Sequence, residues 1–255
     1  MSHRLEVIPV HDLPEIATGD PLGELITRRL AGAGVEPAAG DIVAVVQKAV
    51  SKAEGRVREL HEVVPGPNAR RLATRLGKDP RLVELILAES RRVVRADHGV
   101  LIVETNGGWI CANAGIDASN LPGEAEVSLL PADPDRSARR IRAEIAAGCD
   151  ARPAILIVDS FGRPWRVGQA ETAIGCAGLV ALDDWQGRTD AHGRPLAATA
   201  VAVADQLAGA ADLVRDKVSG APAITTTGAG RWRTDADGPG AAAALQRPAG
   251  EDLFR

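Results

Sequence analysis

Continuous apolar runs mark the strands that this chain is expected to bury. Ile42–Val46 and residues 154–158 contain no polar side chain, which is typical of strands covered on both faces. The segment Ala223–Thr227 predicts one more strand near the end of the chain. Residues 100–103 and 109–112 flank Asn106-Gly107-Gly108. Because an Asn-Gly pair accepts the positive φ of a tight turn, these two segments predict a β-hairpin.

Apolar residues recur at helical spacing in the intervening segments. Two short helices are predicted between residues 68 and 90, the second starting at Asp79-Pro80. A longer helix is predicted from Asp135 to Gly148, and residues 199–217 form an alanine-rich segment predicted to be helical.

Strands and helices are mixed without regular alternation, which favours an α+β fold with mixed sheets over a doubly wound sheet. After residue 228 the chain is rich in alanine, glycine and proline and is expected to be mobile or a linker. We therefore expect one domain over residues 1–245, with room for two subdomains, and a tail or linker remnant over residues 246–255.

The composition narrows the class of protein. The 255 residues are 45% hydrophobic and 25% charged, with a formal net charge of −4, as in ordinary globular proteins. An acidic balance, four tryptophans, two phenylalanines and no tyrosine argue against a nucleic-acid partner. No membrane-length apolar run and no signal-peptide core is found, so we expect no membrane partner and a cytoplasmic location.

Several common catalytic motifs are absent from the sequence. Gly77-Lys78 is followed by Asp79, so there is no phosphate-binding P-loop. His61-Glu62 is not completed by a second histidine, because Pro65 stands at that position, and no Gly-x-Ser-x-Gly elbow occurs. The three cysteines fit neither a disulfide framework nor a metal knuckle.

Two acidic residues stand where an apolar strand is expected to end. Asp117 lies among small residues, and Asp159 is followed by Ser160. Carboxylate and hydroxyl oxygens suit Mg²⁺ or Mn²⁺, which bridge protein groups and substrate phosphates. Lys52, Arg163 and Arg166 are candidate partners of phosphate oxygens. The alternative is that the aspartates cap turns and the arginines form surface ion pairs.

Five blocks of sequence, in order, resemble one enzyme family, and the similarity runs from about Val7 to Pro222. The blocks are Ser51-Lys52-Ala53-Glu54-Gly55-Arg56, Ala112-Asn113-Ala114-Gly115-Ile116-Asp117-Ala118-Ser119-Asn120, Leu130-Pro131-Ala132-Asp133-Pro134-Asp135, Asp159-Ser160-Phe161-Gly162-Arg163 and Ala173-Ile174-Gly175. They resemble the γ-glutamyl ligases that attach glutamate to the deazaflavin redox cofactor coenzyme F-420.

The resemblance implies an activity, cofactors and partners. A GTP-dependent ligase would join the amino group of L-glutamate to the lactyl carboxylate of the deazaflavin precursor and extend a γ-linked tail. It would use Mg²⁺ or Mn²⁺, with K⁺ as a further cofactor. The resemblance also implies an uncommon α+β fold and an intertwined homodimer.

The resemblance assigns roles to residues of this chain. Asp117, Asp159 and Ser160 match the metal positions of the family, and Lys52, Asp117 and Asp159 are the catalytic candidates. The nucleotide positions are Leu13, Pro14, Glu15, Ile16, Gln47, Lys48, Lys52 and Asn120. Gln47 and Lys48 align with a pair that is Ser-Thr in some relatives, and residues 213–220 align with another nucleotide-lining loop.

Other interpretations of the sequence remain open. The same residues would suit another metal-dependent phosphoryl-transfer enzyme, such as a nucleotide hydrolase, or a nucleotide-binding protein without catalysis. The ending Glu251-Asp252-Leu253-Phe254-Arg255 resembles the junction before a nitroreductase-like domain in fused relatives. No such domain follows here, so we expect a stand-alone ligase or an N-terminal fragment.

Overall fold

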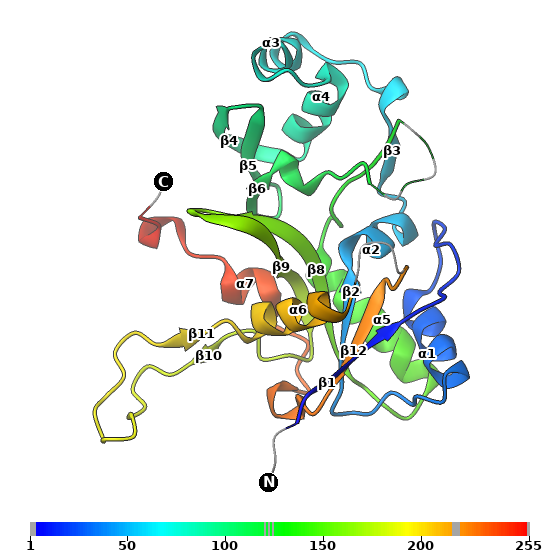
Figure 1. The fold of residues 1–255 in the computed structure, drawn as a ribbon, viewed down its shortest axis with the longest axis vertical. Helices are drawn as coiled ribbons and strands as arrows, with labels where there is room; N and C mark the ends of the chain where they lie inside the picture. Colours follow the sequence, from blue (N-terminus) through cyan, green and yellow to red (C-terminus); the bar gives the residue numbers. More distant parts are fainter. Residues whose placement is uncertain (1–3, 120, 122, 124, 216–219, 254–255) are drawn as a thin grey trace.

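A five-stranded mixed sheet forms the centre of the molecule (Figure 1). The computed structural model describes residues 4–119, 121, 123, 125–215 and 220–253. The strand order is β1 (Glu6–Val10), β12 (Ala223–Thr227), β2 (Ile42–Val46), β8 (Ala154–Arg163) and β9 (Arg166–Ala177). β2 and β8 are parallel, and the other neighbours are antiparallel.

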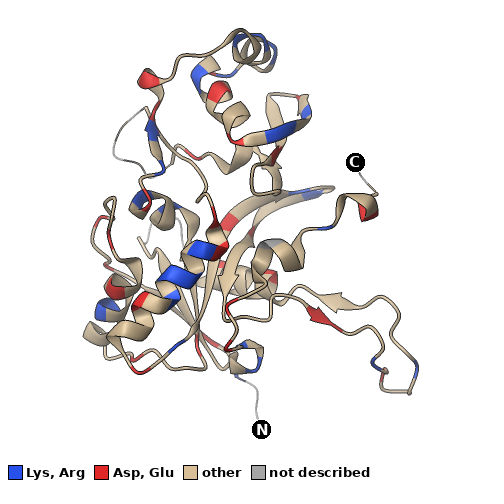
Figure 2. Cartoon of the chain, turned by 180° about the vertical axis from the view of Figure 1, so that it is seen from behind, with Lys and Arg blue, Asp and Glu red and all other residues tan. Residues whose placement is uncertain are grey.

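Helices cover both faces of this sheet, which is why β2 and the first half of β8 are continuously apolar. Val43 and Ile155 face the helices α1 (Leu22–Gly32), α2 (Gln47–Ala53) and α5 (Pro134–Gly148). Ile42 and Leu156 face α6 (Val203–Val214). Figure 2 shows α5, with several charged residues along its length, lying across the sheet from behind.

Close approach between α5 and β9 explains one of the glycines in the family blocks. α5 starts at Pro134, with the carboxylate of Asp133 accepting a hydrogen bond from the Arg136 amide. A Cβ added at Gly175 would lie 2.4 Å from the carbonyl carbon of Pro134. Only glycine therefore fits this position without displacing the helix.

A smaller layer lies above the sheet and has its own apolar core. It consists of α3 (Pro67–Leu76), α4 (Pro80–Ala88) and the antiparallel sheet of β4 (Ser90–Asp97), β5 (Val100–Thr105) and β6 (Ile110–Ala112). β3 (Val57–Glu59) and β7 (Glu126–Ser128) pair in the connection to the main body. The remaining short elements are the 3₁₀ turns η1 (Leu60–Glu62), η2 (Asn113–Gly115), η3 (Gly230–Trp232) and η4 (Ala249–Glu251).

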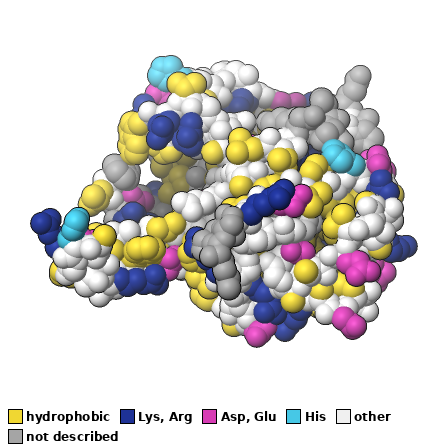
Figure 3. All heavy atoms as spheres, turned by 60° about the horizontal axis from the view of Figure 1, so that its bottom comes forward, with side chains coloured by type: hydrophobic (Ala, Val, Ile, Leu, Met, Phe, Trp, Pro, Cys, Tyr) yellow, Lys and Arg dark blue, Asp and Glu magenta, His cyan; other side chains and the backbone are white. Residues whose placement is uncertain are grey.

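A long loop carrying β10 (Asp183–Asp184) and β11 (Ala200–Val201) stands away from the body. Seen from below, this arm borders a hollow on the surface (Figure 3). Among the described residues, no helix combines the length and apolar character that crossing a membrane requires.

Most predicted elements are confirmed, together with the α+β class. The predicted strands at 42–46 and 223–227, the hairpin, the two helices between 68 and 90 and the helix ending at Gly148 are all present. The strand predicted at 154–158 continues to Arg163, and the helix predicted over 199–217 begins only at Val203. Ala200 and Val201 pair with β10 instead, so their backbone groups are already used.

The prediction of a mobile segment after residue 228 is wrong for its first part. Ala229 is 1% exposed and Ala241 is fully buried, and α7 (Gly240–Leu245) packs against β9. The side chain of Arg142, which has no exposed surface, donates hydrogen bonds to the carbonyl oxygens of Thr234 and Asp235. A charged residue of α5 therefore holds the segment whose composition predicted mobility.

Candidate active site

A cavity of about 780 Å³ opens where the carboxyl end of β2 lies beside the middle of β8, at Val158 and Asp159. These strands are parallel and adjacent, so α2, which follows β2 directly, and Asp159 reach the same edge of the sheet. The loop after β1, the segment after β6 and the segments around Arg215 and Pro222 complete the wall. The cavity therefore joins parts of the chain that are far apart in sequence.

Every described residue to which the family resemblance individually assigns a catalytic, metal or nucleotide role lines this cavity. They are Leu13, Pro14, Glu15, Ile16, Gln47, Lys48, Lys52, Asp117, Asp159 and Ser160. Asn120 lies outside the described residues, as do residues 216–219 of the predicted nucleotide loop. Asp117 and Asp159 thus share one pocket, as a joint role in metal binding requires, while the role of each residue stays a prediction.

Two lysines of α2 contribute positive charge to the cavity. Lys48 and Lys52 are one helical turn apart, and each side chain is only 16% exposed. Lys52 Nζ lies 2.6 Å from Glu15 Oε1 on the loop after β1, whose side chain is 75% exposed. An ion pair with so exposed a partner is weak, so Lys52 is readily available to an anionic ligand.

Asp117 is held by the other lysine and by its own loop. Its Oδ2 atom lies 2.9 Å from Lys48 Nζ, and its Oδ1 atom accepts a hydrogen bond of 2.7 Å from the Ser119 amide. Burial acts to raise the pKa of Asp117, but the hydrogen bonds from Lys48 and Ser119 outweigh it and hold the pKa below its ordinary value. Asp117 is therefore a carboxylate at neutral pH.

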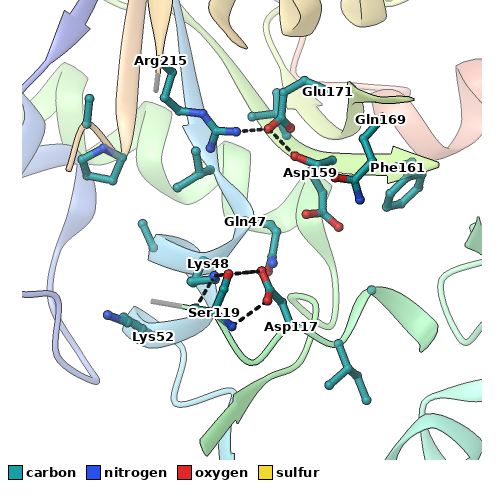
Figure 4. A pocket seen from close by; sticks show the side chains of 18 of the residues that line it. Gln47, Lys48, Lys52, Asp117, Ser119, Asp159, Phe161, Gln169, Glu171 and Arg215 are labelled. Atoms are coloured by element: carbon teal, nitrogen blue, oxygen red, sulfur yellow. Dashed lines mark hydrogen bonds and ion pairs between the residues drawn. The ribbon is translucent and has the colours of Figure 1, made fainter. Parts of the chain in front are cut away.

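Asp159 has a different environment on the opposite wall (Figure 4). Burial, the charge of Glu171 and, to a smaller extent, the charge of Asp117 raise the pKa of Asp159 to about 7. Ser160 Oγ donates a hydrogen bond of 2.9 Å to Glu171 Oε1, which also pairs with Arg215. The excess negative charge near Asp159 is what a bound cation would relieve.

The raised pKa of Asp159 predicts a pH dependence of stability. The folded state binds the proton more tightly than the unfolded chain, whose carboxyl has a pKa near 3.8. The contribution of Asp159 to the free energy of unfolding should therefore fall as the pH rises from about 4 to about 7.

Urea titrations in metal-free buffer test this pH dependence. The free energy of unfolding of Asp159→Asn, minus that of the unchanged protein, should be larger at pH 8 than at pH 5. An equal difference at both pH values would contradict the assigned environment of Asp159.

Sequence reasoning missed Gln169 and Glu171, which also line the cavity. β9 runs antiparallel to β8, with Glu171 opposite Ser160 and Gln169 opposite Gly162. A sequence argument could have found them if β8 and the following strand had been predicted as a hairpin, because alternate residues of the returning strand then face the same pocket as Ser160. Arg215, also in the wall, lies in the segment already assigned to a nucleotide loop.

The predicted phosphate contacts of Arg163 and Arg166 do not match the structure. Arg163 and Arg166 lie at the exposed end of the β8–β9 hairpin and do not line the cavity, so neither is placed to neutralise a bound phosphate.

The oxygen atoms of the predicted metal residues are ligands that suit a hard divalent cation. Asp117, Asp159 and Ser160 offer oxygen atoms, and carboxylates of this kind suit Mg²⁺ or Mn²⁺. Within the described part of the chain, no three His, Cys, Asp or Glu side chains already converge on one point as metal ligands. The residues fit such an ion in charge and type, provided that Asp117 is released from Lys48.

Comparison with known proteins places the chain in one family. Residues 11–228 match the model of the family described as F420-0:Gamma-glutamyl ligase. The Coenzyme F420:L-glutamate ligase of Methanothermobacter thermautotrophicus is 41% identical over 98% of this chain and 99% of its own length. The protein of the same name from Methanopyrus kandleri is 41% identical over 99% of this chain and 97% of its own. The chain belongs to the F420-0:γ-glutamyl ligase family and is a ligase enzyme.

Proposed function

We propose that this ligase uses GTP to activate the carboxylate of the deazaflavin precursor as an acyl phosphate, which glutamate then converts to an amide. The observation that carries the proposal is the convergence of Lys48, Lys52, Asp117 and Asp159 on one cavity. Membership of the ligase family supplies the two substrates to be joined.

The chemistry requires activation because oxide is a poor leaving group from a carboxylate. One carboxylate oxygen attacks the terminal phosphorus of GTP, and the bond to the GDP oxygen breaks. The amine of glutamate then attacks the acyl carbon, loses a proton and expels phosphate. For this second step the nitrogen must be deprotonated and held about 3 Å from the carbon.

Lys52 is proposed to stabilise the negative charge that moves to the leaving phosphate. Its ammonium group is fixed near the end of α2 and faces the cavity from the side of the loop after β1. We assign that loop, Leu13 to Ile16, to nucleotide binding, together with Gln47 and Lys48. Gln47 is 3% exposed, and its amide oxygen accepts a hydrogen bond from Ser51 at 3.0 Å, so its position is fixed.

Asp117, Asp159 and Ser160 are proposed to hold Mg²⁺ or Mn²⁺. Such an ion would screen the repulsion between the substrate carboxylate and the nucleotide phosphates, an effect worth several kcal/mol. The remaining parts of the proposal are K⁺ as a further cofactor, extension through γ-linked glutamates and a homodimer. The arm of β10 and β11, which stands away from the body, is suited to contact a second copy.

The test combines two products of one incubation. The chain is mixed with the deazaflavin precursor, GTP, glutamate and Mn²⁺, and GDP release and the mass of the cofactor are measured. We expect GDP release to require both glutamate and precursor, and the cofactor mass to increase by one glutamyl residue for each addition.

Other outcomes would separate the competing functions. GDP release without glutamate or precursor would indicate a nucleotide hydrolase. Binding of GTP without any product would indicate a nucleotide-binding protein. Product formation with ATP but not GTP would retain the ligase and reject the nucleotide assignment.

A further inference from the structure

The ammonium group of Lys48 forms an ion pair with the carboxylate of Asp117, which is proposed to bind metal. Lys48 Nζ contacts Asp117 Oδ2 at 2.9 Å, Ser119 Oγ at 2.8 Å and the Ser119 carbonyl oxygen (Figure 4). The hydroxyl of Ser119 in turn donates to Asp117 Oδ2 at 2.9 Å. Lysine, aspartate and serine thus form a closed polar cluster on the wall of the cavity.

Both carboxylate oxygens of Asp117 are engaged in this cluster. Oδ1 accepts from the Ser119 amide, and Oδ2 accepts from Lys48 and from the Ser119 hydroxyl. A divalent cation approaching Oδ2 meets the positive charge of Lys48 at contact distance, and like charges in a partly buried site repel strongly. The ion and the ammonium group therefore compete for one oxygen atom.

We propose that Lys48 is a tethered cation that excludes divalent metal from Asp117 until the nucleotide arrives. The phosphates of the nucleotide offer Lys48 an alternative anionic partner inside the same cavity, and Asp117 is freed to bind the ion. The free enzyme consequently binds metal weakly, and the ion enters with or after the nucleotide. This inference rests on the proposed metal role of Asp117.

Lys52 provides a matched control on the same helix. It lies one turn after Lys48, its side chain is equally buried, and it also faces the cavity. Its hydrogen bond goes to Glu15 Oε1 and not to an aspartate assigned to the metal. Removing either charge should weaken nucleotide binding, whereas only the removal of Lys48 should strengthen metal binding.

The experiment measures the binding of Mn²⁺ without nucleotide, through the electron paramagnetic resonance signal of the free ion. The proteins compared are the unchanged chain, Lys48→Met, Lys52→Met, Asp117→Asn and the double variant Lys48→Met/Asp117→Asn. Lys48→Met removes the ammonium group that competes with the ion for Asp117, so Mn²⁺ binding should become tighter by about tenfold or more. Lys52→Met should stay close to the unchanged chain, and the double variant should lose the gain.

A second measurement tests whether Lys48→Met lowers nucleotide affinity while it raises Mn²⁺ affinity. Calorimetric titration with GDP in metal-free buffer should show weaker binding in both Lys48→Met and Lys52→Met. Should Lys48→Met fold poorly, Lys48→Gln removes the same charge and keeps a hydrogen-bond donor. Opposite changes in Mn²⁺ and GDP affinity in one variant are not expected from a purely structural defect.

The outcomes distinguish the inference from the function on which it rests. Unchanged or weaker Mn²⁺ binding in Lys48→Met, with binding weakened in Asp117→Asn, would overturn the competition and leave the metal role of Asp117 intact. Mn²⁺ binding as tight in the double variant Lys48→Met/Asp117→Asn as in Lys48→Met would overturn both, because Asp117 would then not bind the ion even when Lys48 is absent. Ligase activity of the unchanged chain is measured separately and bears only on the proposed reaction.

Discussion

Replacing Asp159 with asparagine is expected to reduce ligase turnover by about a hundred- to a thousandfold, as the loss of a group that stabilises charge in the reaction does. The amide has nearly the shape of the carboxylate but lacks its charge, and it is a poor ligand for a hard cation. Since Asp159 lines the cavity beside Ser160 and Glu171, the change removes charge where the metal is proposed to bind. Glutamate-dependent GDP release at saturating Mn²⁺ measures the effect.

The control for Asp159 is Asp184→Asn. Asp184 is an exposed aspartate of β10 whose Oδ1 atom accepts a hydrogen bond from the Gln186 amide, and an asparagine oxygen can replace it. Turnover of this variant should stay close to that of the unchanged chain. An Asp159→Asn protein that is folded and retains more than half of the turnover would exclude the proposed metal role.

Replacing Arg142 with methionine is expected to lower the free energy of unfolding by about 3 kcal/mol or more. The buried guanidinium donates hydrogen bonds to the carbonyl oxygens of Pro153, Thr234 and Asp235 and pairs with Asp237. Methionine fills much of the volume but leaves these acceptors without their donor. Urea denaturation measures the loss, and limited proteolysis should cut the segment after residue 228 more rapidly.

Arg139→Met on the same helix is the control for this experiment. Arg139 is 40% exposed and lies 3.9 Å from Asp133, and exposed ion pairs of this kind contribute about 0–1 kcal/mol. The two variants therefore remove the same charge from α5 at a buried and at an exposed position. Similar stabilities of the Arg142 and Arg139 variants would show that Arg142 does not hold the C-terminal segment.

The cavity was the part of the site that the sequence predicted best. Asp159 was expected at the end of an apolar strand, and Lys48 and Lys52, to which the family resemblance assigned nucleotide roles, follow the apolar strand at residues 42–46. The parallel pairing of β2 and β8 then brings these ends to one edge. For both Asp117 and Asp159 the sequence pattern left a turn cap and a metal ligand as alternatives, and the family blocks favoured the ligand.

Glu171 and Arg142 show why the rest could not be predicted. Glu171 reaches the pocket because the register of β9 sets it opposite Ser160, and that register includes irregularities that a sequence pattern does not reveal. Arg142 is a charged residue, yet it lies on the buried face of α5, where the C-terminal segment accepts its hydrogen bonds. In both cases a distant segment of the chain decides the environment of the side chain.

The sequence by itself determined the α+β class, the buried strands at residues 42–46, 154–158 and 223–227, four of the helices, the family and the cavity residues that match the family. It could do so because periodicity and local motifs are properties of neighbouring residues. Only the tertiary structure decided that Arg163 and Arg166 lie outside the cavity, that Glu171 lies within it, and that Lys48 holds Asp117. These outcomes depend on strand register and on contacts between residues far apart in sequence. Lys48 and Asp117, which form an ion pair, are 69 positions apart. The physical reason is that charge and hydrogen bonding act through space, whereas a sequence pattern records only order along the chain.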